Sequence, residues 1–251
     1  MKFTEKYEVT SHDVDVNNNM RPSLIIRYMQ ETANHQMRDR GPTYFDLFFK
    51  GMSFVITRMT VEITSQLHQY DKIEVSTWNC PCKGATFIRC YEITRDGELA
   101  ARAYSAWAMN NLNTGKLCRT SDVDLSNYES GEPFEMNLPT RVRLPKDIEY
   151  ENVGSKEVMY SDVDMNVHMN NTNYPDMLWN YIPDIRNKKL TSVNLRFIAE
   201  APLGSTVDIY MGKAAEPYKG DTMAEEAYCF ASRVGEKTNV EAVFGLAPVE
   251  R

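Results

Sequence analysis

Residues 161–171 bring acidic, amide and imidazole side chains together in one short segment. Asp164, Asn166 and His168 occupy every second position, so in an extended segment their side chains point to the same side. A carboxylate beside an imidazole fixes its tautomer and favours its protonated form. A carboxamide can donate a hydrogen bond to a carbonyl oxygen. These residue types are therefore suited to chemistry on a carbonyl group.

A helix is expected directly after this segment, from about Thr172. The first backbone N–H groups of a helix have no partner inside it and form a ready site for an oxyanion. We therefore expect Asn170, Asn171 and Thr172 to stabilise an oxyanion or to bind substrate. The structural alternative is that Asn170 or Asn171 serves only as the N-cap of the helix.

The same segment occurs earlier in the chain in an altered form. His12-Asp13-Val14-Asp15-Val16-Asn17-Asn18-Asn19-Met20 matches residues 161–169 without a gap, and Asn19 stands where the second copy has His168. The chain has four histidines, and the other three lie in no comparable polar cluster. A repeat of this kind indicates a duplicated domain, with the chemically active residue in the second copy.

A weaker match gives the second copy a carboxylic acid as well. Aligning residues 71–75 with residues 205–209 pairs Gln66 with Glu200. Glu200 is therefore the candidate base or nucleophile. The alternative is that Glu200 is an ordinary surface acid at the end of a strand.

Both halves follow the order strand, loop, helix and several strands. Apolar spacing predicts one helix from Pro22 to about Arg40, ended by Gly41-Pro42, and a second of about ten residues from Thr172. Strands are predicted at 3–10, 52–63, 73–78, 86–94, 99–109, 191–198, 206–212, 223–234 and 240–248. This order predicts an α+β fold of two tandem hot-dog domains, each a curved antiparallel sheet wrapped around a central helix.

The predicted domains are separated by a polar stretch punctuated with Pro and Gly. We expect an N-terminal hot-dog domain at 1–120, a linker at 121–156 and a catalytic C-terminal hot-dog domain at 157–251.

Composition excludes several classes of protein. The 251-residue chain has a net charge of −7, which disfavours nucleic-acid binding. No apolar run approaches the roughly 18 residues of a membrane span, and residues 1–7 do not resemble a signal peptide. Five scattered cysteines indicate a reduced, cytoplasmic protein. Cys80-Pro81-Cys82 lacks the spacing of a metal site, so we expect no metal and no cofactor.

The run Asp164-x-Asn166-x-His168-x-Asn170-Asn171, followed by Thr172-Asn173-Tyr174, resembles the signature of acyl-ACP thioesterases, tandem hot-dog enzymes of plants and bacteria. The similarity covers essentially the whole chain and includes Pro22, Trp78, Asp96-Gly97, Ser105-x-Trp107 and Phe197-x-x-Glu200. It implies that Asp164, Asn166, His168 and Glu200 are the catalytic set and that the first half holds the acyl chain. Plant relatives have a cysteine after the glutamate, where this chain has Ala201, so a Cys–His mechanism is not expected.

The resemblance implies hydrolysis of fatty acyl-ACP thioesters to free fatty acid and holo-ACP, which ends fatty-acid chain elongation. Glu200 would act as general base on a water placed with the help of Asn166, while His168, held by Asp164, polarises or donates. Direct attack by Glu200, giving an anhydride, is left open. A thiol leaving group with a pKa of about 8.5 needs little acid assistance.

The implied partner is an acyl carrier protein with a phosphopantetheine-linked fatty acyl chain. That partner is acidic, so docking requires a basic patch, for which Arg186, Lys188 and Lys189 are candidates. Whether the chain forms a homodimer is left open.

Three alternatives remain at this point. An acyl-CoA thioesterase differs only in the carrier of the acyl group. A hot-dog dehydratase or hydratase would need an acid on the central helix, where Asp176 is the one available. A non-enzymatic lipid-binding module would release no thiol.

Overall fold

A computed structural model describes residues 1–249, so the last two residues of the predicted second domain lie outside the described chain. The elements of the first half are β1 (Phe3–Glu8), α1 (Pro22–Arg40), α2 (Tyr44–Phe49), β2 (Met52–Ile63), β3 (Lys72–Lys83), β4 (Thr86–Arg95) and β5 (Glu98–Asn111). Those of the second half are β6 (Glu151–Glu157), α3 (Tyr174–Trp179), β7 (Lys188–Phe197), β8 (Thr206–Lys213), β9 (Glu226–Val234) and β10 (Lys237–Pro248). Short 3₁₀ turns occur at Thr120–Asp122, Tyr160–Asp162, Asn171–Asn173 and Ile185–Asn187.

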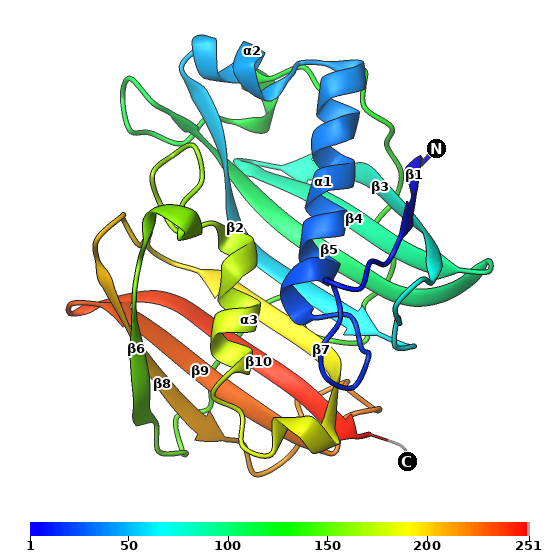
Figure 1. Cartoon of the computed structure of the whole chain (residues 1–251). Coiled ribbons are helices and arrows are strands. Elements are labelled where there is room, and N and C mark those ends of the chain that lie inside the picture. Colours follow the sequence, from blue (N-terminus) through cyan, green and yellow to red (C-terminus); the bar gives the residue numbers. More distant parts are fainter. Residues whose placement is uncertain (250–251) are drawn as a thin grey trace.

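The strands of the described chain join one antiparallel sheet, in the order β1-β3-β4-β5-β2-β7-β10-β9-β8-β6 (Figure 1). The second half of this order is the first half reversed, with β7 in the place of β2. The two halves meet where Arg58–Glu62 of β2 pair with Ser192–Arg196 of β7. Two curved half-sheets, each with its own helix, make up the tandem hot-dog architecture that the sequence predicted.

Helix α1 has the predicted bounds, for identifiable local reasons. Pro22 occupies the first turn, where its missing N–H costs nothing, and Gly41 ends the helix with a φ of 58°. The Gly41 N–H donates to Met37 O and so closes the last turn. The apolar side of α1 is buried against the sheet.

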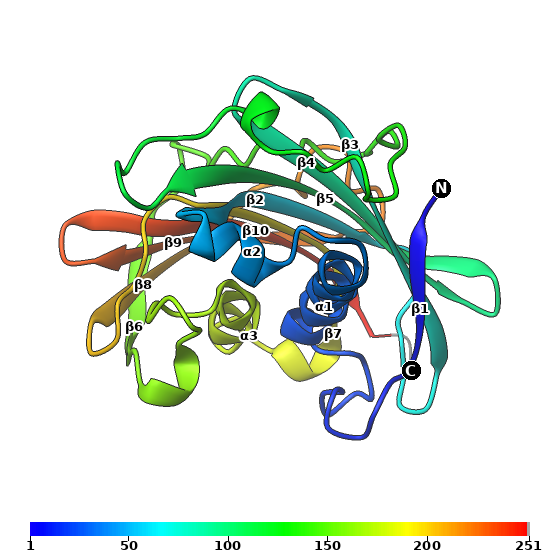
Figure 2. The same ribbon diagram turned by 90° about the horizontal axis from the view of Figure 1, so that it is seen from above.

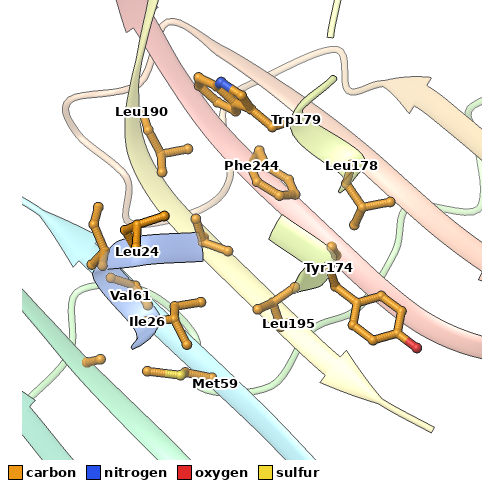
Figure 3. Packing of buried hydrophobic residues seen from close by; sticks show 14 of the residues in the cluster. Leu24, Ile26, Met59, Val61, Tyr174, Leu178, Trp179, Leu190, Leu195 and Phe244 are labelled. Atoms are coloured by element: carbon orange, nitrogen blue, oxygen red, sulfur yellow. The ribbon is translucent and has the colours of Figure 1, made fainter. Parts of the chain in front are cut away.

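The hydrophobic core lies between the helices and the centre of the sheet (Figure 3). α1 and α3 both contribute side chains to it, so the two halves share one core instead of forming two separate ones. The side chains labelled in Figure 3 are Leu24 and Ile26 of α1, Tyr174, Leu178 and Trp179 of α3, Met59 and Val61 of β2, Leu190 and Leu195 of β7 and Phe244 of β10.

The predicted ten-residue helix from Thr172 is wrong in length, because α3 has 6 residues. The chain then continues in a tighter conformation, with Ile182 N–H donating to Trp179 O. Pro183 explains the stop, since a proline disfavours the helical conformation of the residue before it. Among the described residues, no helix is both long enough and apolar enough to cross a bilayer.

The N-termini of α1 and the α3 region meet and cap each other. Ser23 N–H donates to Asp176 Oδ1 at 2.9 Å, and Asp176 N–H donates to Ser23 Oγ at 2.9 Å. Arg27 Nε donates to Thr172 Oγ1 at 3.1 Å. Ser23 matches Thr172 in the repeat and Arg27 matches Asp176, so these contacts are related by a pseudo-two-fold axis between the helices.

We expect Asp176→Ala to lower the free energy of unfolding by about 1–2 kcal/mol, because it leaves the Ser23 N–H without its cap. Urea unfolding monitored by circular dichroism measures this. Replacement of the exposed Asp147 by alanine is the matched control. Equal stability of the two variants would contradict the capping role.

The helices and the chain between the two halves lie on opposite faces of the sheet (Figure 2). On the outer face, Leu138 N–H donates to Glu62 Oε1 of β2 at 2.7 Å. Strand β6 occupies the end of the stretch that the sequence analysis assigned to the linker, and pairs with β8. The assignment of residues 121–156 as a linker between the two domains stays a prediction.

Candidate active site

The loop that carries His168 folds back on itself and is not extended as the sequence analysis assumed. Asp164 N–H donates to His168 O and Val167 N–H donates to Asp164 O, both at 3.0 Å. The Asp164 carboxylate accepts from Asn166 N–H at 2.8 Å. The expected side-chain contact between Asp164 and His168 is therefore not formed within residues 1–249, where the carboxylate instead holds the turn together.

Glu200 is brought to His168 by backbone pairing between two loops. Met169 N–H donates to Ala201 O at 2.8 Å, and Leu203 N–H donates to Val167 O at 3.1 Å. His168 Nε2 consequently lies 3.2 Å from Glu200 Oε2. The Glu200 side chain is 58% exposed and that of His168 31%, so water has access to both groups.

The same pairing recurs in the first half and confirms the alignment of Gln66 with Glu200. Met20 N–H donates to Leu67 O at 2.7 Å, as Met169 N–H does to Ala201 O. Gln66 Nε2 donates a hydrogen bond to Leu190 O at 2.8 Å. An ionised carboxylate has no proton to donate, so Glu200 cannot copy this contact and pairs with the imidazole instead.

Asn239 anchors the loop that carries Glu200, and the sequence analysis did not identify it. The Asn239 backbone oxygen accepts from Ile198 N–H at 2.9 Å and from Ala199 N–H at 3.1 Å. Its side-chain amide also donates to Ala199 O. Asn239 is fully buried in β10, far from Glu200 in the sequence, so no local pattern could reveal this contact.

Tyr44 of α2 is a second residue that the sequence analysis missed. Its hydroxyl donates to Asn166 Oδ1 at 3.3 Å, a long contact that links the first half to the loop. With the amide oxygen so engaged, Asn166 Nδ2 is the group left to donate to a substrate carbonyl. The capping box between Thr43 and Asp46 is a sequence signal that predicts α2, although not the contact with Asn166.

Two of the three expected oxyanion donors, the backbone N–H groups of Asn170 and Thr172, already have partners. Asn170 N–H donates to Asp162 O, and Thr172 N–H donates to Asn170 Oδ1, each at 2.9 Å. The side chains of Asn171 and Thr172 accept from Gln30 and Arg27 of α1. The capping role weighed as the structural alternative is the one that Asn170 performs.

Asp162 has a structural role beside the site. Partial burial by itself raises the pKa of Asp162, but Lys156 Nζ at 2.8 Å and the Met159 N–H outweigh this and lower the pKa. A cleft of about 470 Å³ lies next to this residue, between α1 and the loop, and neither His168 nor Glu200 lines it.

The predicted docking patch lies away from His168 and Glu200. The patch lies at the start of β7, with Lys188 and Lys189 as its first residues and Arg186 just before them. Glu200 follows the other end of this strand. The length of β7 alone separates them by about 30 Å. Lys188 Nζ is also engaged with Glu226 at 2.9 Å. The patch stays a prediction, and its position argues against it.

Two family models together match most of this chain. Residues 1–128 match the family model described as acyl-ACP thioesterase N-terminal domain, and residues 146–239 match that of the C-terminal domain. Oleoyl-acyl carrier protein thioesterase 2 of Arabidopsis thaliana is 28% identical over 82% of this chain and 61% of its own length. A palmitoyl-acyl carrier protein thioesterase of the same plant is 25% identical over 79% and 52%. The chain thus spans less than two thirds of these relatives.

Solved structures show the same fold. An acyl-ACP thioesterase from Bacteroides thetaiotaomicron superposes with a TM-score of 0.85, at 21% identity, over 98% of both chains. The 12:0-ACP thioesterase from Umbellularia californica superposes with a TM-score of 0.83, at 16% identity, over 99% of this chain and 94% of its own.

Proposed function

Because the chain belongs to the acyl-ACP thioesterase family, we propose that it hydrolyses fatty acyl-ACP to free fatty acid and holo-ACP. The observation that carries this proposal is the water-accessible pair of His168 Nε2 and Glu200 Oε2, 3.2 Å apart. The first half has no such pair at the corresponding positions, which Asn19 and Gln66 occupy. The repeat therefore assigns the candidate pair to the second half, whereas the His35–Glu31 contact of the first half, at 3.1 Å, lies within α1 and not at the equivalent position.

In the proposed mechanism, Glu200 is the general base that removes a proton from the attacking water. The imidazole of His168 orients the carboxylate, and the amide nitrogen of Asn166 donates to the thioester carbonyl oxygen. The Asp164 carboxylate positions Asn166 by accepting a hydrogen bond from the Asn166 backbone N–H. The thiolate leaves without a strong acid, since a thiol has a pKa of about 8.5.

The acyl chain is proposed to lie in the first half, between α1 and its half-sheet. Two features support this. The core there is continuous with the apolar side of α1, and Tyr44 of the same half contacts Asn166 of the loop.

The rival dehydratase function is disfavoured by the surroundings of Asp176. Both of its carboxylate oxygens are engaged, one by Ser23 N–H at 2.9 Å and the other by Arg21 at 3.5 Å. An acid used to cap α1 is poorly placed to protonate a leaving group.

Thiol release from acyl-ACP of several chain lengths, with the matching acyl-CoA thioesters in parallel, tests the proposed function. We expect faster turnover with acyl-ACP at one preferred chain length. Equal turnover with both carriers would favour an acyl-CoA thioesterase. Binding of acyl-ACP without thiol release would favour a lipid-binding module.

A further inference from the structure

The two ends of the β2–β7 pairing carry different charges on the outer face of the sheet. At one end Glu62 lies opposite Ser192, and at the other Arg58 lies opposite Arg196. These positions are equivalent in the repeat, because Glu62 matches Arg196 and Arg58 matches Ser192. The repeat therefore provides an internal comparison between the end near Gln66 and the end near Glu200.

Charges balance at the end near Gln66. Glu62 is buried and pairs with Arg102, Nη2 to Oε2, at 2.6 Å, while Ser192 is neutral. At the other end the same pair is present with its signs reversed, as Arg196 pairs with Glu241 at 2.9 Å. Arg58 is then an extra cation directly opposite Arg196. Like charges placed opposite each other destabilise a sheet.

Nothing in the described chain compensates Arg58. Its guanidinium has no hydrogen bond or ion pair within residues 1–249, and its Nε is buried without a partner. Its neighbour on β5 is Ala106, which offers no charge. A buried donor without an acceptor is costly, and an anion from outside the chain that contacts the rest of the guanidinium would offset both this cost and the repulsion from Arg196.

The Arg58–Arg196 pair lies at the end of β7 that leads to the proposed catalytic base. The β2–β7 pairing ends at Arg58 and Arg196, and no further pair joins the two strands beyond this point. Glu200 follows Arg196 by four residues, so their Cα atoms are at most about 14 Å apart.

We propose that Arg58, together with Arg196, binds the phosphodiester of the phosphopantetheine arm of the acyl donor. This assignment rests on the proposed function. Thirteen bonds separate the thioester sulfur from the phosphorus, so the arm spans about 16 Å when extended and less when bent. The arm is therefore long enough to reach from Glu200 to Arg196, whose Cα atoms are at most about 14 Å apart. Guanidinium groups recognise phosphate oxygens through paired charge-assisted hydrogen bonds.

The variant Arg58→Ala tests this with three donors of one acyl chain: acyl-ACP, acyl-CoA and acyl-pantetheine, of which the last has no phosphate. We expect KM to rise about tenfold or more for the two phosphorylated donors, with kcat nearly unchanged. Hydrolysis of acyl-pantetheine should keep the kinetics of the unaltered protein. For the phosphorylated donors, the KM of Arg58→Lys should lie between the values of the unaltered protein and of Arg58→Ala, because lysine retains the charge and loses the paired geometry.

Arg119→Ala is the control for the loss of one positive charge, since Arg119 is exposed and lies outside the second half. It should change KM little for any donor. An Arg58→Ala effect equal for all three donors would assign Arg58 a structural role and overturn the proposal. An effect confined to acyl-ACP would also overturn it, in favour of carboxylates on the carrier protein. If the unaltered protein hydrolyses none of the donors, the proposed function fails and not merely the phosphate site.

Discussion

Replacing Glu200 by glutamine is expected to lower kcat/KM for acyl-thioester hydrolysis by about two orders of magnitude or more. The substitution keeps the size of the side chain and removes its ability to accept a proton from water. It also recreates the first half, where Gln66 occupies the equivalent position and donates to Leu190 O. Steady-state thiol release at saturating and subsaturating acyl-ACP measures the loss. Because water reaches the Glu200 carboxylate, the fold should tolerate the change.

Gln66→Ala is the matched control for this prediction. It removes the corresponding side chain from the half in which Asn19 stands in place of the catalytic imidazole, so kcat/KM should stay within about twofold. The free energy of unfolding should fall by about 1 kcal/mol, since the Leu190 carbonyl loses its donor. If Gln66→Ala and Glu200→Gln reduced turnover equally, the active pair would not belong to the second half alone.

Much of this fold could be predicted because the repeat constrains distant parts of the chain. One match predicted two half-sheets of the same topology, and a second made Glu200 the equivalent of Gln66. The pairing of Met20 with Leu67 and of Met169 with Ala201 shows why both matches hold. Each joins the loop before a helix to the loop after the central strand, so similar sequences give similar contacts.

The conformation of the catalytic loop could not be predicted from the placement of polar residues at every second position. Val167 has a φ of 63°, which is unusual for a β-branched residue and turns the chain back on itself. An extended segment would place Asp164 and His168 on one side, whereas this turn directs Asp164 to Asn166 N–H. The repeat did contain a signal, because Asn18 matches Val167, and asparagine adopts positive φ more readily than valine.

Contacts between residues far apart in the sequence were also outside the reach of sequence patterns. Tyr44 approaches Asn166, and Asn239 holds Ala199, only because the sheet brings distant residues together. Arg58 illustrates the same limit. In the sequence it is one charge in an alternating strand, and its lack of a partner becomes visible only once β7 and β5 are placed beside β2.

Replacing His168 by alanine is likewise expected to lower kcat/KM by about two orders of magnitude or more, because Glu200 loses the imidazole that orients it at 3.2 Å. The loss should appear mainly in kcat, measured by thiol release from saturating acyl-ACP. Asn19→Ala, at the matching position of the first half, should leave kcat within about twofold. A comparable loss in both variants would contradict the division of labour between the halves.

The double variant His168→Ala/Glu200→Gln tests whether the two groups act as one unit. Residues that cooperate in a single step give non-additive losses, so the double variant should be about as slow as the slower single variant. Two independent contributions would instead multiply to about four orders of magnitude. That larger loss would show that His168 acts directly on the substrate, and the orienting role derived from its contact with Glu200 would have to be abandoned.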